Sequence, residues 1–298
     1  KDQRDKLLSL SDTSGAALYA DYILREKRCW ADVLFDFDSI QLGVDSVLTV
    51  LPAMRPRHFS IASAPSTKVD GLKDDEFRVE LCVAVVEGTT PLGRSYHGLC
   101  SNYLASLNPM ASIQLWIQPG SFGKLPLQVN ENGCFETPIL CIGSGTGIAP
   151  LRSLLLEREA VFEKLCTNPA ETNGNDSKRD NILVFGCRKK SMDYYYSDDW
   201  ETLVKEKHLK VLTAFSRDQW HKIYVQQVLR DADHGKLIEN HILERQGAIY
   251  VAGGAKMARA VKEEILECLA KAVGDDKQAA LLLKRMHLQG RYCVEAWS

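Results

Sequence analysis

Apolar and polar positions along the chain follow two different periods. Residues 1–36 place apolar residues at helical spacing, as in ALYADYILREKRCWADVLFDF, and predict helices. Residues 57–64 and 78–87 are rich in Val, Ile and Phe and predict strands. Residues 104–126 predict a helix end, a strand and a loop rich in Pro and Gly. This part of the chain therefore predicts a helical segment followed by antiparallel β structure.

From residue 138 onward, strand-like and helix-like runs alternate. This alternation is the βαβ pattern of a doubly wound parallel sheet. The pattern predicts three parts: a helical segment over residues 1–48, an antiparallel β domain over 49–137, and a Rossmann-like nucleotide-binding α/β domain over 138–298. The expected strands of the third part are 139–142, 182–186, 210–215 and 248–252, and the expected helices are 151–165, 200–206, 222–230 and 255–273.

Composition narrows the class of protein. With 298 residues, 45% of them hydrophobic, the chain can bury a substantial core and is not disordered. Its net charge of -2 argues against nucleic acid as the main ligand. No apolar run approaches the roughly 18 residues that span a bilayer, and the start KDQRDKLLSL has no signal-peptide character. The nine cysteines include no CxxC pair, which favours buried, reduced thiols in a cytoplasmic protein and no metal site.

A glycine-rich turn follows the first expected strand of the α/β part. Gly143, Gly145 and Gly147 separate residues 139–142 from a helix-like run that contains Pro150 near its start. Glycines let the backbone approach a phosphate, and the start of a helix attracts anions. Pro150 suits the first helical turn. Because the spacing is G-x-G-x-G, not G-x-G-x-x-G, a plain tight turn stays open as an alternative.

A second candidate site follows the strand expected at 210–215, in TAFSRDQWHKIYVQ. Ser216, Arg217, Lys222 and Tyr224 offer two cations and two hydroxyls at a strand end. That combination suits an additional phosphate such as the 2′-phosphate of NADPH. A solvated polar turn would have the same composition.

Two further motifs lie in the β part. In MRPRHFSIASAP, Arg57 can pair with a pyrophosphate, Phe59 offers a flat ring and Ser60 offers a hydroxyl. An ordinary strand could have the same sequence. In HGLCSNYL, Gly98 and Ser101 stand where a helix could begin, and Ser101 is a plausible N-cap. Such a helix start would form another phosphate site.

Taken together, these motifs resemble the ferredoxin–NADP reductase-like half of the diflavin reductases. That family includes cytochrome P450 reductase, the sulfite reductase flavoprotein and the cytosolic diflavin reductase of iron–sulfur protein assembly. The similarity covers residues 55–298. It rests on RPRHFSIAS, GLCS, GSGTGIAPLR, FGCR, AFSRDQWHKIYVQ, YVAGGAKMARAV and RYCVEAWS.

The resemblance implies FAD and NADPH as cofactors and assigns roles to residues. Arg57 would bind the FAD pyrophosphate, Phe59 would stack on the flavin ring, and Ser60 would hydrogen-bond near flavin N5. Trp297 would shield the flavin until nicotinamide displaces it, and Glu295 would supply the carboxylate that is usually an aspartate. The other implied cofactor-binding residues are His58, Gly98, Leu99, Cys100 and Ser101 for FAD, and Thr146, Ser216, Arg217, Lys222, Ile223, Tyr224, Val225 and Gln226 for NADPH.

Two departures from the family pattern point to one branch of it. Ala252 stands where many members have a cysteine near the hydride path, and Ala260 stands at a frequent acidic NADPH contact. The missing cysteine and a compact helical segment make the chain most similar to the cytosolic diflavin reductases of iron–sulfur protein assembly. A P450-reductase-like supplier of electrons to haem enzymes and a catalytically silent docking module are the alternatives.

The resemblance also implies parts beyond this sequence. The FMN-binding domain and the first strands of the FAD-binding β-barrel are expected upstream of residue 1. Residues 1–48 would then be an incomplete helical connecting segment, and residues 49–137 would be the rest of the antiparallel β-barrel. The expected partners are that FMN domain and an iron–sulfur protein acceptor of the cytosolic assembly machinery. The sequence thus predicts hydride transfer from NADPH to FAD, followed by electron transfer through FMN.

Overall fold

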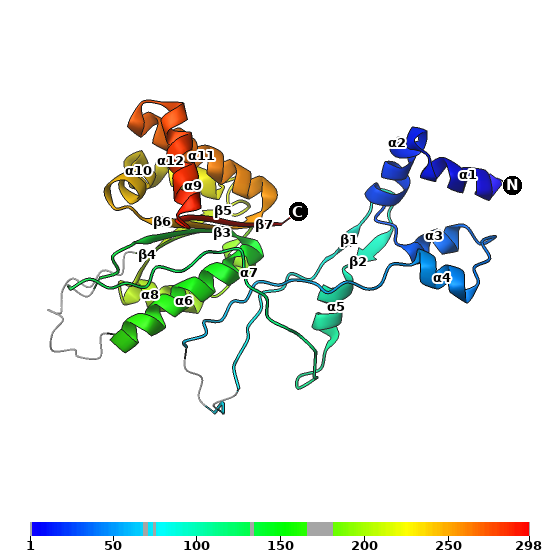
Figure 1. The fold of residues 1–298 in the computed structure, drawn as a ribbon, viewed down its shortest axis with the longest axis horizontal. Coiled ribbons are helices and arrows are strands. Elements are labelled where there is room, and N and C mark those ends of the chain that lie inside the picture. Colours follow the sequence, from blue (N-terminus) through cyan, green and yellow to red (C-terminus); the bar gives the residue numbers. More distant parts are fainter. Residues whose placement is uncertain (1, 68–70, 74–75, 132–133, 166–180, 298) are drawn as a thin grey trace. The chain divides into compact units, whose positions relative to one another are not determined.

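The chain forms two compact units. The computed structural model describes residues 2–67, 71–73, 76–131, 134–165 and 181–297 (Figure 1). Residues 1–58 and 83–114 make up the first unit, and residues 59–82 and 115–298 make up the second. Among the described residues, no helix combines the length and the apolar character needed to cross a bilayer. The expected division at residues 48 and 137 stays a prediction.

The first unit consists of short helices and one small sheet. Helices form where the sequence predicted them, within residues 1–36. The antiparallel sheet pairs Glu87 with His97 and Thr89 with Ser95 around a turn that ends at Gly93. The elements of this unit are α1 (Asp2–Ser11), η1 (Thr13–Gly15), α2 (Ala16–Tyr19), η2 (Ala20–Arg25), α3 (Trp30–Asp36), α4 (Val44–Val50), β1 (Glu87–Thr89), β2 (Ser95–His97) and α5 (Leu99–Ser106).

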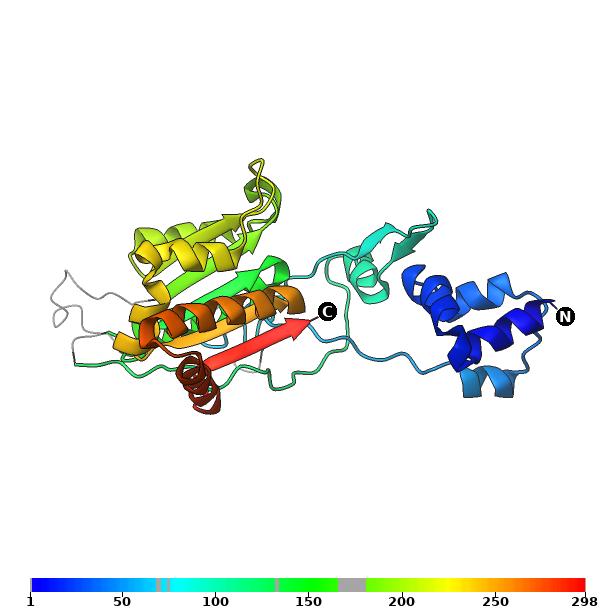
Figure 2. The same cartoon turned by 90° about the horizontal axis from the view of Figure 1, so that it is seen from above.

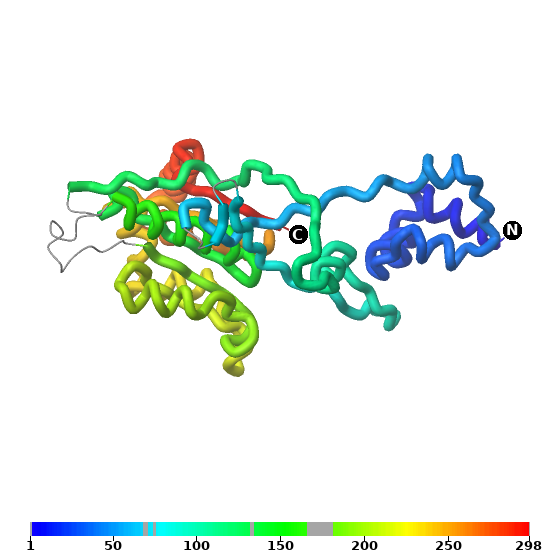
Figure 3. The backbone as a smooth tube through the Cα atoms, turned by 90° about the horizontal axis from the view of Figure 1, so that it is seen from below, coloured from blue at the N-terminus to red at the C-terminus, as the bar shows by residue number. Residues whose placement is uncertain are grey.

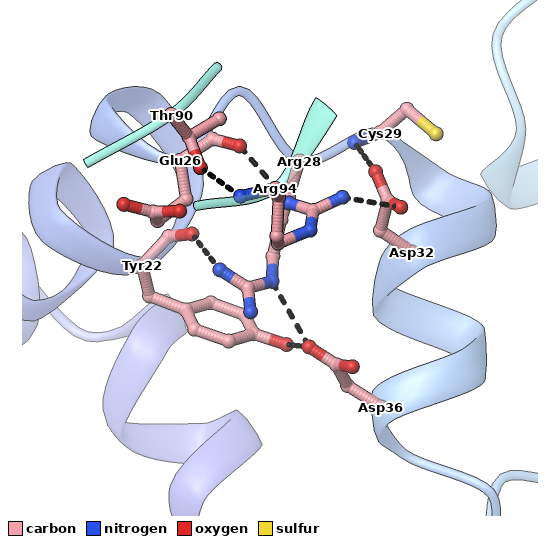
Figure 4. Close-up of polar contacts among 8 residues, drawn as sticks. All are labelled: Tyr22, Glu26, Arg28, Cys29, Asp32, Asp36, Thr90 and Arg94. Atoms are coloured by element: carbon pink, nitrogen blue, oxygen red, sulfur yellow. Dashed lines mark hydrogen bonds and ion pairs between the residues drawn. The ribbon is translucent and has the colours of Figure 1, made fainter. Parts of the chain in front are cut away.

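A polar network holds the helices of the first unit to this sheet (Figure 4). Arg94, next to β2, pairs with Asp32 of α3 at 2.6 Å, and Arg28 pairs with Asp36 at 2.9 Å. The hydroxyl of Tyr22 donates to Asp36 at 2.7 Å, which lowers the pKa of that carboxyl, and burial with this bond raises the pKa of Tyr22 to about 12. The Asp36 contribution to stability is therefore present above the ordinary carboxyl pKa and is lost only as pH falls through the lowered value.

The second unit is built on a five-stranded parallel sheet in the order β5-β4-β3-β6-β7. Chain order reverses between β3 and β6, which makes that pair the topological switch point of a doubly wound fold. Its strands are β3 (Ile139–Ser144), β4 (Asn181–Cys187), β5 (Leu209–Phe215), β6 (Ala248–Gly254) and β7 (Tyr292–Trp297). Its helices are η3 (Gly145–Gly147), α6 (Ile148–Leu165), α7 (Lys190–Asp193), α8 (Ser197–Lys205), α9 (Val225–Asp231), η4 (Ala232–Gly235), α10 (Leu237–Glu239), η5 (Asn240–Glu244), α11 (Ala255–Val273) and α12 (Asp276–Leu288).

Helices cover both faces of this sheet, as Figures 1 and 2 show. On one face, α9 to α12 pack on alternate strand residues such as Ile142 and Val251. On the other, α6 and α8 pack on the residues between them, such as Cys141 and Tyr250. Strands covered on both faces must be apolar throughout, and this explains why β3 and β6 were recognisable as continuous apolar runs. The doubly wound parallel sheet predicted from the sequence is confirmed.

The predictions of continuous strands over residues 57–64, over residues 78–87 and within residues 104–126 are wrong. Residues 61 and 81 form a single antiparallel bridge, and the antiparallel structure of the described residues is otherwise the β1–β2 pair and a bridge between Val129 and Phe135. A strand needs a hydrogen-bonded neighbour along its length, and these segments have only single partners in the described ranges. Conversely, α12 and β7 were not among the expected elements.

Residues 59–67 run alongside α6, as the tube in Figure 3 shows. Arg152 of α6 holds this segment: its guanidinium donates to the carbonyl of Ala62 at 2.9 Å and pairs with Glu80 at 2.7 Å and with Asp199 at 2.5 Å. Its side chain is 11% exposed and also lies over the ring of Tyr196. One half-buried cation therefore joins the 59–82 segment to both α6 and α8.

We expect Arg152→Ala to lower the free energy of unfolding by about 1–3 kcal/mol, because two partly buried carboxylates and a carbonyl lose their donor. Urea unfolding followed by fluorescence measures this. Arg78→Ala is the matched control, since Arg78 pairs with the same Glu80 from an exposed position, and it should cost less than about 1 kcal/mol. Equal losses in the two variants would contradict the role given to Arg152.

Candidate cofactor site

The glycine-rich turn lies at the carboxyl end of β3, at the switch point of the sheet. Gly147 packs so closely on β6 that a Cβ there would stand 2.2 Å from the carbonyl oxygen of Ala252. Gly145 has φ +55°, a left-handed conformation that favours glycine. Pro150 lies in the first turn of α6, as predicted. The turn therefore brings backbone N–H groups and the start of α6 to the place where doubly wound sheets bind the pyrophosphate of a dinucleotide. The glycines of the turn fit a bound pyrophosphate. Thr146, predicted to touch the pyrophosphate, is half-buried at the centre of this turn.

The carboxyl ends of β4 and β5 are joined by backbone hydrogen bonds. The N–H groups of Ser216 and Arg217 donate to the carbonyls of Cys187 and Arg188 at 2.9 and 2.8 Å. The side chains of Arg217 and Arg188 are exposed and form no ion pair with the described residues. Two cations without carboxylate partners thus lie on adjacent strand ends, as a 2′-phosphate site requires.

The remaining predicted NADPH residues follow β5 and reach into α9. Lys222 and Tyr224 are exposed, and the N–H of Tyr224 donates to the side chain of Gln227 at 2.8 Å. Val225 is buried against the sheet and Ile223 packs at the margin of the same core, so these two side chains position the segment. Gln226 is half-buried in the first turn of α9.

The structure brings together Ser60 and Glu295, which are 235 positions apart in the sequence. The hydroxyl of Ser60 donates to one oxygen of the Glu295 carboxylate, and the hydroxyl of Ser121 donates to the other at 3.2 Å. Glu295 lies on β7 directly beside Ala252 of β6. Trp297 is two residues further along the same strand, 39% exposed. A carboxylate held at both oxygens and an accessible ring therefore share the carboxyl end of β7.

The predicted FAD-contacting residues are distributed over both units. Phe59 and Ser60 belong to the second unit, whereas Arg57, His58 and residues 98–101 belong to the first. Arg57 and His58 are exposed, and Arg57 forms no ion pair with the described residues. Phe59 is half-buried. A free cation such as Arg57 fits a pyrophosphate.

The helix start in GLCS begins earlier than predicted. The N-cap of α5 is Gly98, not Ser101, because Ser101 turns inward and its hydroxyl accepts the N–H of Val86 at 3.0 Å. A Cβ on Gly98 would stand 2.7 Å from that of Val86, so this close approach needs glycine. Leu99 is exposed and Cys100 half-buried in the first turn of α5. The exposed helix start suits a phosphate and so fits FAD.

Two residues of the site were missed in the sequence. Ser121 could not be identified from the sequence, because it lies in an irregular segment and its partner Glu295 is 174 positions away. Arg188 could have been identified from the sequence, because it is the cation directly after β4, in the FGCR motif. Strand-end cations of a doubly wound sheet face the ligand crevice.

Comparison with known families matches both parts of the chain. Residues 1–103 match the model of the FAD binding domain, and residues 141–263 match that of the oxidoreductase NAD-binding domain. Together the two matches include every predicted site residue except Glu295 and Trp297.

The similar proteins are named as NADPH-dependent reductases of two kinds. NADPH-dependent diflavin oxidoreductase 1 of Mus musculus is 35% identical over 307 residues and that of Danio rerio is 34% identical over 303, each covering 99% of this chain and 46% of the relative. NADPH–cytochrome P450 reductase of Drosophila melanogaster is 34% identical over 305 residues, 99% of this chain and 41% of the relative. The chain thus spans less than half the length of these relatives.

We expect Gly147→Ala to lower the free energy of unfolding by about 1–3 kcal/mol, because the new Cβ has to displace the backbone of β6. It should also weaken binding of NADP⁺ by moving the turn. Thermal unfolding and isothermal titration measure the two effects. Gly120→Ala is the control, because a Cβ there meets nothing within 4 Å. An unchanged melting temperature and NADP⁺ affinity in Gly147→Ala would show that the close approach is not required.

Proposed function

Because the chain belongs to the FAD- and NAD-binding oxidoreductases, we propose that it is the part of an NADPH-dependent diflavin reductase that passes hydride from NADPH to FAD. The contact that carries this proposal is the one between Ser60 and Glu295 beside the switch point of the sheet. NADPH and FAD, when bound, supply the hydride donor and acceptor. The protein supplies alignment, charge and exclusion of water.

Ser60 and Glu295 place a hydroxyl and a carboxylate at the reacting rings. With FAD bound, the Ser60 hydroxyl would rotate its one proton from Glu295 to an acceptor nitrogen of the flavin, and the Glu295 carboxylate would then stabilise positive charge on the nicotinamide. The hydrogen bond from Ser121 would restrict the rotation of Glu295, whose side chain is one methylene longer than the aspartate that the family resemblance implies at this position. Trp297 would shield the flavin face until nicotinamide displaces it.

Nucleotide choice is proposed to depend on the strand ends of β4 and β5. Ser216, Arg217, Lys222 and Tyr224 would hold the 2′-phosphate, with Arg188 beside them. Gln226, and the backbone at Ile223 and Val225, would border the adenosine. Arg57 with His58, and the helix start at Gly98–Ser101, would hold the FAD phosphates.

The proposed route beyond FAD requires a second flavin. In diflavin reductases FMN receives the electrons, so the partner of this module would be an FMN domain, and a protein acceptor would follow. We assign that acceptor to the iron–sulfur proteins of the cytosolic assembly machinery and the protein to the cytoplasm. Ala252, at the position of the cysteine found in many relatives, supports this branch.

A second candidate acceptor is a haem enzyme of the P450 type. The observation that favours it is the 34% identity to the P450 reductase of Drosophila melanogaster, which is as high as that to the diflavin oxidoreductase of Danio rerio.

We expect Arg217→Ala to raise the Michaelis constant for NADPH about 10–150-fold, because one charge-assisted contact worth about 1.5–3 kcal/mol is lost. The Michaelis constant for NADH should barely change, since NADH has no 2′-phosphate. Ferricyanide reduction by the FAD-loaded protein measures both constants. Lys210→Ala is the control, because Lys210 is an exposed cation on β5 that forms no ion pair within the described part of the chain. Equal losses with the two nucleotides would refute the assignment.

The acceptor assignment predicts a difference in rates. The protein joined to its FMN domain should reduce an iron–sulfur acceptor of the cytosolic assembly machinery faster than a P450. Without the FMN domain, neither acceptor should be reduced at a comparable rate, because protein acceptors draw on FMN. Ferricyanide should still be reduced, because this small oxidant can take electrons from FAD directly. Stopped-flow absorbance follows all three. Faster P450 reduction would favour the second candidate.

A further inference from the structure

Asp218 follows β5 in the second unit, directly after Arg217. Its carboxylate accepts the N–H of Lys190, the first residue of α7, at 2.9 Å. The two residues are 28 positions apart in the sequence, so this bond joins the loop after β5 to the loop after β4. None of the roles proposed above involves Asp218.

The backbone pairing of β4 and β5 ends just before this bond. Its last hydrogen bonds run from the N–H groups of Ser216 and Arg217 to the carbonyls of Cys187 and Arg188. Beyond them, the hydrogen bond that connects the two loops in the described part of the chain is the one from Lys190 to Asp218. Asp218 therefore continues the connection between the strands after their backbone ladder has ended.

The loop that carries Asp218 is closed on itself. The side-chain amide of Gln219 donates to the carbonyl of Phe215 and to that of His221, the latter at 2.8 Å. These bonds span Arg217 and Asp218, so the loop holds its shape around both residues. A contact that fixes Asp218 consequently fixes Arg217 as well.

The two loops carry an excess of positive charge. Their exposed cations, which form no ion pair with any described residue, are Arg188, Lys189, Lys190, Arg217 and Lys222. Like charges repel, so the cations favour separation of the loops, and the bond to Asp218 opposes it. Burial raises the pKa of the Cys187 thiol to about 12, and the carboxylates of Asp193 and Asp218 add to the rise. This effect agrees with a position of Asp218 close to the end of β4.

Asp193 is a useful contrast within the same loop. Its carboxylate accepts the N–H of Lys189 at 3.2 Å, four positions away in the sequence. That bond is local to the loop after β4, whereas the bond of Asp218 crosses from one strand end to the other.

We propose that Asp218 is a positioning residue for nucleotide selectivity. By accepting the N–H of Lys190, it fixes the separation of Arg188 and Arg217, so that both guanidinium groups reach the same 2′-phosphate. The inference rests on the proposed function, in which the 2′-phosphate of NADPH binds at these strand ends. The negative charge of Asp218 by itself opposes a phosphate, so its charge and its positioning effect have opposite signs.

Two substitutions separate these effects. Asp218→Asn removes the charge and keeps an oxygen that can accept the N–H, whereas Asp218→Ala removes both. We expect Asp218→Ala to weaken NADP⁺ binding about 2–12-fold, because the hydrogen bond that positions the arginines is lost. Asp218→Asn should bind NADP⁺ at least as tightly as the unchanged protein. Isothermal titration of the FAD-loaded protein at constant ionic strength measures these affinities.

Glu263→Ala is the matched control for the loss of an exposed carboxylate. Glu263 lies on α11 and forms no hydrogen bond or ion pair with the described residues, so NADP⁺ affinity should not change. The Michaelis constant for NADH, measured by ferricyanide reduction, gives a second readout. It should stay within about 2-fold in Asp218→Ala, because NADH has no 2′-phosphate for the arginines to reach.

Three results would overturn the inference. Tighter or unchanged NADP⁺ binding by Asp218→Ala would show that the bond to Lys190 does not position the arginines. Equal weakening by Asp218→Ala and Asp218→Asn would assign the effect to the charge and not to the acceptor. Equal losses for NADP⁺ and NADH in Asp218→Ala would indicate a general structural role.

Arg217→Ala in the same titration separates this inference from the proposed function. If Arg217→Ala weakens NADP⁺ binding and Asp218→Ala does not, the role of Asp218 alone is refuted. If Arg217→Ala leaves NADP⁺ binding unchanged, the proposed 2′-phosphate site is refuted, and the role of Asp218 with it.

Discussion

The second unit depends on one close approach of two backbones. The turn after β3 crosses the carboxyl end of β6 with no room for a side chain on Gly147, because the carbonyl of Ala252 occupies that space. This approach sets where α6 begins, and α6 carries Arg152, which holds the 59–82 segment and with it Ser60. Ala252 is also the neighbour of Glu295 across the β6–β7 pair. The glycine-rich turn, the Ser60 hydroxyl and the Glu295 carboxylate are therefore all connected to the contact between Gly147, in the turn after β3, and Ala252 of β6.

The irregular segment 121–128 links the two edges of the same sheet. Ser121 contacts Glu295 near the carboxyl end of β7, whereas Lys124 lines a small cavity at the amino ends. Phe122, between them, packs on Tyr250 in the middle of β6. This segment therefore contacts both the carboxyl end of β7 and the middle of β6.

The sequence predicted the second unit well because its signals are local. Buried parallel strands are continuous apolar runs, so β3 and β6 could be read directly, and α11 was predicted with the bounds it has, Ala255–Val273. Residues 57–64 and 78–87 have equally strong β propensity but form a single bridge, since pairing depends on a neighbour that propensity does not encode.

The same distinction applies to the candidate site. Residues 143–147 and Arg217 follow strands, and a strand end of a doubly wound sheet can be expected to face the ligand. The N-cap at Gly98 was misread because the Ser101 hydroxyl bonds to Val86, a partner in another element. Ser121 and Asp218 lie in irregular segments and bond to partners in other parts of the chain, so no periodicity or spacing could reveal these contacts.

The place of Glu295 on β7 has a consequence for biosynthesis. The ribosome completes β7 after the other four strands of the sheet, although β7 pairs only with β6. The sheet can therefore fold as far as β6, with its nucleotide turn formed, before the carboxylate partner of Ser60 exists. A nascent chain at that stage would contain the glycine-rich turn but not the carboxylate that contacts Ser60, so these two parts of the candidate site form at different times during synthesis.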